Sequence, residues 1–296
     1  MIYLSQINQA MTYKSVSDIC RVHSSVEMID PRTSQGYEVF TFSFLLPGYV
    51  FAIFSNTMGL LYWQLNEIWQ APSKASIEYD LKWKMTHYYV QHMYEPIYPI
   101  TILEPYLANI TDPNATISIY VVSELVDGIR GHLYCSIQTL ETFTPRFTFS
   151  YQVRLNSSGT QHIAKMPFQN LMRDFECTSS NSCLLHCSYN DSQHEIGQTL
   201  FLTRPKYYQL YQPNIRISNI QQISTNDIEL TLNATRPALF VWLDMPKNTS
   251  GYYSENGFHM FKSSRTIMFH SWTTITNLNS MNFDLHLTSL YDVTQS

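Results

Sequence analysis

The sequence has few charged residues. Asp, Glu, Lys and Arg make up 14% of its 296 residues, about half the usual share. The formal net charge is −5, and no basic block or basic stripe interleaved with aromatic residues occurs. Nucleic acid is therefore not an expected partner. Protonation of all ten histidines would move the formal charge from −5 to +5 (−5 + 10), which is compatible with an acidic compartment.

The N-terminus lacks the features of a signal peptide. MIYLSQINQAMTYKSVSDIC has no basic start, no continuous apolar core and no small-residue cleavage site. The apolar spacing of Ile2, Leu4, Ile7 and Met11 instead predicts an amphipathic helix within residues 1–27.

Six Asn-x-Ser/Thr triplets nevertheless favour the secretory route. A glycosylated protein needs an entry signal, so we expect either that the triplets are unused or that the signal peptide is missing from this chain. The candidate glycosylation sites are Asn109, Asn114, Asn156, Asn190, Asn233 and Asn248.

Three of the five cysteines lie close together in the run CTSSNSCLLHC. A disulfide from Cys177 to Cys183 or Cys187 would close a small loop, which suits an oxidising compartment. The other two, Cys20 and Cys135, stand alone. A zinc site made by the cluster and its histidine is the alternative, but the spacing lacks a paired C-x2-C unit and the neighbouring segment reads as a strand. A disulfide is the favoured interpretation.

An apolar run at residues 39–54 is short for a membrane span. It holds 16 residues with Pro47 and Gly48 in the middle, whereas a spanning helix needs about 20. A hairpin of two buried strands is an alternative, and a third is that residues 37–56 do not belong to the native fold. We expect no membrane anchor.

Residues 59–94 read as a strand, a loop and a helix. GLLYWQL at residues 59–65 is almost wholly apolar, which predicts a strand buried on both faces. Residues 77–94 predict a helix with Ser76 as its N-cap. Helix, buried strand, helix is typical of an α/β fold with a parallel sheet.

From about residue 98 the periodicity changes to two. Five strand-like runs before residue 206 predict one β-sandwich, and five more after it predict a second. In DIELTLNA the alternation predicts that Ile228, Leu230 and Leu232 point inward. Residues 205–213 read as the linker between the sandwiches.

Two tryptophans, Trp63 and Trp69, bracket the polar end of the apolar run. In (β/α)8 barrels the active site lies at the C-terminal ends of the strands. Trp63 to Trp69 would lie at the C-terminal end of the strand predicted at residues 59–65. An indole face is a flat platform for the C–H face of a sugar, and the amides of Gln64 and Asn66 can bond hydroxyls without adding charge. The residues therefore indicate a sugar site. The alternative is that Trp63 fills a core and Trp69 packs under the loop.

The run GLLYWQLNEIWQAPS resembles the last barrel strand of the β-mannosidases, lysosomal glycoside hydrolases of family 2. The similarity extends to IYLSQINQAM before it and EYDLKWKMTHYYVQ after it. Near the C-terminus, ALFVWLD, GYYSENGF, RTIMFHSW and LTSLYD are similar to the terminal immunoglobulin-like domain of that family. The resemblance covers nearly the whole chain except residues 31–56, and it is weak over residues 100–205.

The resemblance implies the fold class α/β plus all-β. The end of a (β/α)8 TIM barrel would occupy residues 1–97, with an anomalous insert at 37–56. Immunoglobulin-like β-sandwiches would follow at 98–206 and 207–296.

The implied activity is that of an exo-acting, retaining β-mannosidase of the lysosome that needs no metal or other cofactor. Its substrate would be an oligosaccharide from N-glycan breakdown, from which it removes terminal non-reducing β-D-mannose. Trp63 would stack on the mannose, Gln64 and Asn66 would shape the pocket, and Trp69 would be structural or form a wall.

The catalytic residues of the family are absent from this chain. A retaining glycosidase needs two carboxyl groups about 5–5.5 Å apart, and the family's two glutamates lie in motifs that precede the position of Met1. We therefore predict that the chain is inactive by itself. Glu67 stands beside the aromatic site, where the family usually carries Asp, and reads as a loop-fixing residue. Lys74 stands where an aromatic residue is common, so the contacts of that loop differ.

Residues 37–56 have no counterpart in the family. An apolar insert at this junction indicates a translated intron or an error in the gene model, and with the missing start it favours a partial gene model. A deliberately truncated protein is the alternative. The competing hypothesis is a non-catalytic glycan-binding or adhesion protein built of immunoglobulin-like sandwiches.

Overall fold

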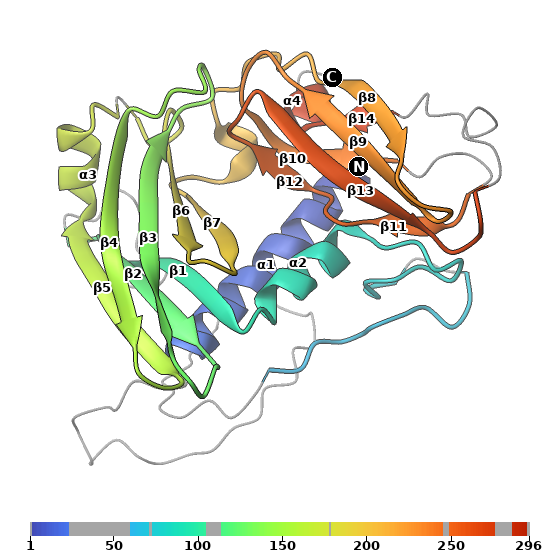
Figure 1. Cartoon of the computed structure of the whole chain (residues 1–296). Helices are drawn as coiled ribbons and strands as arrows, with labels where there is room; N and C mark the ends of the chain where they lie inside the picture. Colours follow the sequence, from blue (N-terminus) through green and yellow to red (C-terminus); the bar gives the residue numbers. More distant parts are fainter. Residues whose placement is uncertain are drawn as a thin grey trace.

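In a computed structural model, the chain forms two antiparallel β-sandwiches (Figure 1). Two helices, α1 (Ile2–His23) and α2 (Met85–Met93), lie where the sandwiches meet. The predicted N-terminal helix is confirmed as α1, with Ile7 and Ile19 buried. The structure describes residues 2–23, 60–70, 73–104, 114–177, 179–244, 249–275 and 286–294.

The first sandwich packs a three-stranded sheet, in the order β1-β2-β5, against a four-stranded sheet, in the order β4-β3-β6-β7. Its core includes Ile117, Leu133 and Tyr189, which are fully buried. The helix α3 (Phe168–Asp174) follows the last strand of the first sheet and buries Phe168 and Leu171 in the same core. The strands are β1 (Ile97–Glu104), β2 (Thr116–Ser123), β3 (Ile129–Gln138), β4 (Phe147–Leu155), β5 (Gly159–Pro167), β6 (Leu184–Asn190) and β7 (Glu195–Phe201).

The second sandwich has a four-stranded sheet, in the order β11-β13-β9-β8, and a three-stranded sheet, in the order β12-β10-β14. Ile228, Leu230 and Leu232 of β9 are 0% exposed, so the predicted alternation is confirmed. The short helix α4 (Leu290–Thr294) ends the described chain. The strands are β8 (Arg216–Gln222), β9 (Asp227–Asn233), β10 (Ala238–Leu243), β11 (Gly251–Tyr253), β12 (Phe258–Met260), β13 (Ser264–Ser271) and β14 (Leu287–Thr288).

Two strands of the first sandwich, β1 and β5, were not among the predicted runs. β1 contains Pro99, which lacks an amide donor, and it lies at the edge of its sheet, where proline is tolerated. β5 is mostly polar and half-buried, so its hydrophobic alternation is weak.

The segment predicted as a linker is packed into the fold. It begins with the 3-10 turn η1 (Pro205–Tyr207), and the buried Tyr208 accepts a hydrogen bond of 2.7 Å from the Leu202 amide. Tyr208 belongs to a core shared by α1, α2 and both sandwiches, with Ile7, Met85 and Phe240 among its members. The segment connects the last strand of the first sandwich to the first strand of the second, and its aromatic side chains pack into this common core.

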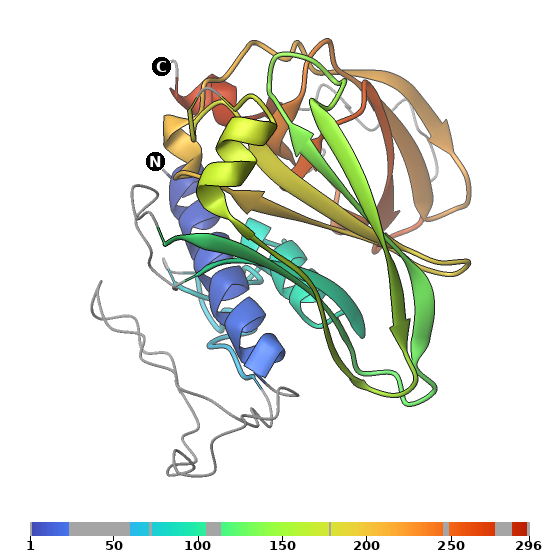
Figure 2. The ribbon, with the colours of Figure 1, turned by 90° about the vertical axis from the view of Figure 1, so that its left-hand side faces the viewer.

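Buried polar groups attach α1 to the first sandwich. Lys14 and Asp18 form an ion pair of 2.8 Å whose side chains are 10% and 5% exposed. Gln198 of β7 donates to Asp18 at 3.2 Å and to the Tyr98 hydroxyl at 2.9 Å. Figure 2 shows α1 running beside β1 and β2. Because each buried charge has a partner, this contact specifies where the helix lies on the sandwich.

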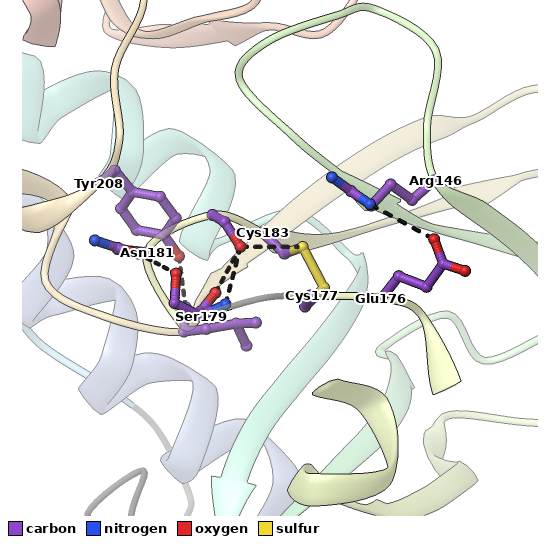
Figure 3. The surroundings of a disulfide bond; sticks show 9 residues. Arg146, Glu176, Cys177, Ser179, Asn181, Cys183 and Tyr208 are labelled. Carbon is purple, nitrogen blue, oxygen red and sulfur yellow. Dashed lines mark hydrogen bonds and ion pairs between the residues drawn. A yellow bond between two sulfur atoms is a disulfide. The ribbon is translucent and has the colours of Figure 1, made fainter. Parts of the chain in front are cut away.

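The cysteines form two disulfides. Cys177 bonds Cys183 across six residues (Figure 3), and Cys135 of β3 bonds Cys187, its cross-strand partner on β6. No partner for Cys135 was predicted from the sequence, because its pairing depends on the register of two strands far apart in the sequence. Since Cys177, Cys183 and Cys187 are all in disulfides, they have no thiolate to offer zinc.

The loop closed by Cys177 and Cys183 is attached to the segment between the sandwiches. Gln209 donates its amide hydrogen to the Asn181 carbonyl at 3.0 Å, and the Ser182 hydroxyl donates to the Ser179 carbonyl at 2.7 Å. Figure 3 shows Tyr208 beside this loop. The disulfide therefore fixes part of the junction between the two sandwiches.

Three of the predicted glycosylation sites, Asn114, Asn156 and Asn190, are exposed, and Asn233 is half-buried at the end of β9. Asn109, Asn248 and the apolar insert at 37–56 lie outside the described residues. None of the helices described here is long and apolar enough to cross a membrane.

Candidate functional site

Residues 60–65 form an extended segment with two different faces. Leu60 and Tyr62 pack against Tyr13 of α1 and against Val90 and Met93 of α2. Three side chains alternate with these and point away from the helices. They are Leu61, Trp63 and Leu65, with 81%, 66% and 54% of their surface exposed.

Hydrogen bonds fix the segment to both helices. The Tyr13 hydroxyl donates to the Trp63 carbonyl and the Tyr94 hydroxyl to the Leu60 carbonyl, both at 2.8 Å. Ser76 donates to the Leu65 carbonyl at 2.9 Å and contacts His87, in the first turn of α2, at 3.0 Å. The segment therefore runs from the C-terminal end of α2 towards its N-terminal end.

The two helices run parallel to each other. Gln6, near the start of α1, accepts a hydrogen bond of 3.0 Å from the amide of Met85 at the start of α2. Arg21, near the end of α1, donates to the Met93 carbonyl at the end of α2, at 2.9 Å. The segment at residues 60–65 therefore runs antiparallel to both helices, and the strands named in the described chain all belong to the two sandwiches.

Two predictions about this region were wrong in detail. Residues 59–65 were expected to form a strand buried on both faces. In the structure, residues 60–65 belong to none of the named strands and bend at Trp63 and Leu65, and only one face of the segment is covered within the described chain. The helix predicted at 77–94 begins only at Met85, with Lys84 as its N-cap. Ser76 is buried in the loop instead, where it bonds the Leu65 carbonyl.

The four residues predicted for the sugar site lie along one stretch of chain. Gln64 donates to the Asn66 carbonyl at 3.1 Å, and Asn66 donates to the Glu67 carbonyl at 3.2 Å. Trp69 is 64% exposed, as open as Trp63. Both indoles are therefore accessible to a ligand in this structure.

Glu67 is held in an ion pair next to this stretch. Its carboxylate accepts hydrogen bonds from the Lys84 ammonium group and from the Ser73 hydroxyl, the latter at 2.9 Å. The hydrogen bond from Lys84 is the main reason that the pKa of Glu67 lies below its usual range. Glu67 is thus an ionised loop anchor, as expected from the sequence.

Sequence reasoning missed a cleft of about 370 Å³ between the start of α1, residues 78–84 and the second sandwich. None of the four predicted site residues lines it. Its aromatic walls include Trp83 and Trp242. The only sequence signal was that both tryptophans lie in the motifs that carry the resemblance.

Comparison with known proteins finds one group of similar enzymes. A family model described as an Ig-fold domain of mannosidases matches residues 210–293. The β-mannosidase of Capra hircus is 29% identical over 298 residues, covering 98% of this chain and 30% of that protein. The chain is related to the β-mannosidases. β-Mannosidase A of Aspergillus terreus is 27% identical over 217 residues, covering 68% of this chain and 22% of that protein.

Solved structures support the same fold. The crystal structure of the β-D-mannosidase from Dictyoglomus thermophilum matches with a TM-score of 0.66 at 18% identity, covering 97% of this chain and 29% of that one. The exo-chitosanase of Amycolatopsis orientalis matches with a TM-score of 0.61 at 12% identity, covering 97% and 33%. Two curated β-mannosidases match 98% of this chain. The chain spans only about 30% of the length of each of them.

Proposed function

We propose that this chain is the C-terminal part of an exo-acting, retaining β-mannosidase. The whole enzyme would hydrolyse terminal non-reducing β-D-mannose residues in oligosaccharides from N-glycan breakdown, in the lysosome. The relatives support the class of reaction, because those reported above for nearly all of the chain are named β-mannosidases.

The observation that carries the proposal is the two-faced segment at residues 60–65. In a (β/α)8 barrel, side chains along each strand alternate between the helix layer and the barrel interior. Leu60 and Tyr62 face helices, while Leu61, Trp63 and Leu65 form an apolar row without a described partner. Residues 1–97 would thus be the end of the catalytic barrel, and residues 98–206 and 207–296 two domains that support it.

The exposed row supports the assignment of Trp63 to the mannose site. Its indole would stack on the sugar, Gln64 and Asn66 would shape the pocket, and Trp69 would form a wall. Retention requires a pair of carboxyl groups, and Glu67 is unsuited to act as the acid because it is ionised and bonded to Lys84. The catalytic pair would therefore come from the part of the enzyme that precedes this chain.

The test begins with the transcript, sequenced upstream of codon 1 and across codons 36–57. The full-length product and the 296-residue chain are then each assayed with p-nitrophenyl β-mannoside, and the anomer first released is identified by proton NMR. The proposal predicts hydrolysis with retention by the full-length product and none by the chain. It is overturned if the full-length product is inactive, or if it binds mannosides without cleaving them, as the competing binding protein would.

A further inference from the structure

The cleft of about 370 Å³ differs from the row at residues 60–65 because three separate parts of the chain build it. Tyr3 and Gln6 come from the start of α1, Trp83 from the segment before α2, and Trp242 and Asp244 from β10 and the residue after it. Its volume lies within the range of about 300–1,000 Å³ that is usual for small-molecule sites.

Most polar groups of the cleft are already bonded to protein. Gln6 accepts from the Met85 amide at 3.0 Å, and the Asn256 side chain bonds both the amide and the carbonyl of Leu243 at 2.9 Å. Lys82 is paired with Asp80 at 2.6 Å, and Lys84 with Glu67. Within the described lining, the polar side chains that remain for a ligand are the Thr288 hydroxyl and two carboxylates.

Two carboxylates line the cleft, Glu78 and Asp244. No hydrogen bond or ion pair joins the Glu78 carboxylate to any residue within the described chain, and Asp244 accepts from the Trp242 indole through one oxygen at 3.1 Å. When Asp80 and Glu67, which pair with the two lysines, are included, the cleft and its immediate surroundings hold four carboxylates and two ammonium groups, an excess of negative charge. Burial, followed by the neighbouring Asp80, raises the pKa of Glu78. The cleft is suited to an uncharged ligand with hydroxyl donors, and it disfavours anionic ones.

The cleft adjoins the stretch assigned to mannose. Asn66 pairs with Ile77, and Ile77 pairs with Trp83, in two consecutive β-bridges. Neighbouring strands lie about 4.8 Å apart, so the backbone of Trp83 lies about 10 Å from that of Asn66. The ion pair between Glu67 and Lys84 also links the two places, because Lys84 lines the cleft.

We propose that this cleft binds an uncharged sugar on the reducing side of the bond that is cleaved, which makes the second sandwich part of the substrate site. Trp242, and the part of Trp83 that is not stacked on Tyr252, supply apolar surfaces for the C–H faces of the sugar. Glu78 and Asp244 accept hydrogen bonds from its hydroxyl groups. The assignment of the reducing side rests on the proposed function, whereas the binding of an uncharged sugar in the cleft does not.

Binding is measured first on the 296-residue chain, by titration with β-1,4-mannobiose followed by tryptophan fluorescence and NMR. Asp244→Asn should weaken binding about tenfold, through the loss of a charged hydrogen-bond acceptor, and Trp242→Phe should weaken it less. Asp227→Asn is the matched control, because this carboxylate lies on the same sandwich and bonds His270 at 2.7 Å. Melting temperatures show whether each variant is folded, and sialyllactose should not bind.

The full-length product then separates this inference from the proposed function. The ratio of kcat/KM for β-1,4-mannotriose to that for p-nitrophenyl β-mannoside should fall about tenfold in Asp244→Asn and stay constant in Asp227→Asn. An unchanged ratio in both variants, or failure of mannobiose to bind the chain, overturns the assignment of the cleft. Cleft-dependent binding by a full-length product that hydrolyses neither substrate supports the sugar site and overturns the proposed function.

Discussion

The ammonium group of Lys84, at the start of α2, donates a hydrogen bond to the carboxylate of Glu67, 17 residues earlier in the chain. The two side chains are only 11% and 8% exposed. The pair holds the end of the extended segment against the helix that follows it. It therefore fixes the stretch proposed to bind mannose relative to the cleft proposed to bind the next sugar.

Replacing Glu67 with Gln should lower the free energy of unfolding of the chain by about 3 kcal/mol at pH 7, because the nearly buried ammonium group of Lys84 loses its counter-charge. The pKa of Glu67 is lowered in the folded state. The stabilisation is therefore present above the unfolded pKa, about 4.3, and is lost as the pH falls through the folded value. Urea unfolding at pH 7 and pH 3 measures the difference.

The control for Glu67→Gln is Glu141→Gln, which changes an exposed carboxylate and should alter stability by less than about 0.5 kcal/mol. An equal loss at both pH values in Glu67→Gln would show that shape, rather than charge, explains the effect.

Two half-buried histidines should make the contact between the sandwiches sensitive to acid. His259 of β12 lies 4.7 Å from the Phe240 ring, and His186 of β6 lies 5.0 Å from the Phe261 ring, measured between centroids. Burial, with a smaller effect of Arg265, lowers the pKa of His186 to about 4 and that of His259 to about 3. Both are therefore neutral in the folded protein at pH 5.

Because the unfolded chain protonates both histidines below about pH 6.5, the free energy of unfolding should fall as the pH drops towards 4. Each histidine contributes about 1.4 kcal/mol per pH unit. Urea unfolding between pH 7 and 4.5 should show a shallower dependence in His186→Asn than in the original chain. His132→Asn, at an exposed position of β3, should keep the original slope, and equal slopes in all three proteins would contradict the prediction.

The two disulfides should differ in their contribution to stability. Cys135 and Cys187 are 52 residues apart, whereas Cys177 and Cys183 are six apart. Loop-closure entropy predicts about 4 kcal/mol for the longer loop and about 2 kcal/mol for the shorter one. Urea unfolding of the two double Cys→Ala variants measures both, and a larger loss from the shorter loop would contradict this account.

The exposed sequons should carry glycans when the chain enters the secretory route. With a signal peptide supplied, we expect a mobility shift that peptide N-glycosidase removes. Changing Asn114, Asn156 or Asn190 to Gln should each remove one step of that shift, because all three are exposed. A single unshifted band before treatment would count against the secretory assignment.

The sequence predicted the sandwiches well where one face of a strand is apolar and the other is polar. DIELTLNA is such a strand, and its inward residues Ile228 and Leu230 are fully buried. β1 and β5 were not predicted because neither shows a clear alternation of apolar and polar residues. Most residues of β1 are buried, and many residues of β5 are half-buried. The Cys135–Cys187 disulfide depends on strand register, which local patterns do not specify.

The candidate site was only partly predictable. Trp63, Gln64, Asn66 and Trp69 could be chosen from residue chemistry and resemblance, but an apolar run does not tell which of its faces is covered. Tyr13 and Tyr94 decide this, through contacts across 50 and 34 residues. The cleft escaped notice because Gln6, Trp83 and Asp244 lie in distant parts of the sequence.

The most direct measurement is kcat/KM for p-nitrophenyl β-mannoside of the full-length product that carries Trp63→Ala. The matched control is Trp272→Ala, which also removes an exposed tryptophan. Trp272 lies just after β13 and is 49% exposed. The account predicts a fall of about tenfold or more for Trp63→Ala, from the lost stacking surface, and none for Trp272→Ala. Full activity in Trp63→Ala would contradict the claim that residues 60–69 form the mannose site.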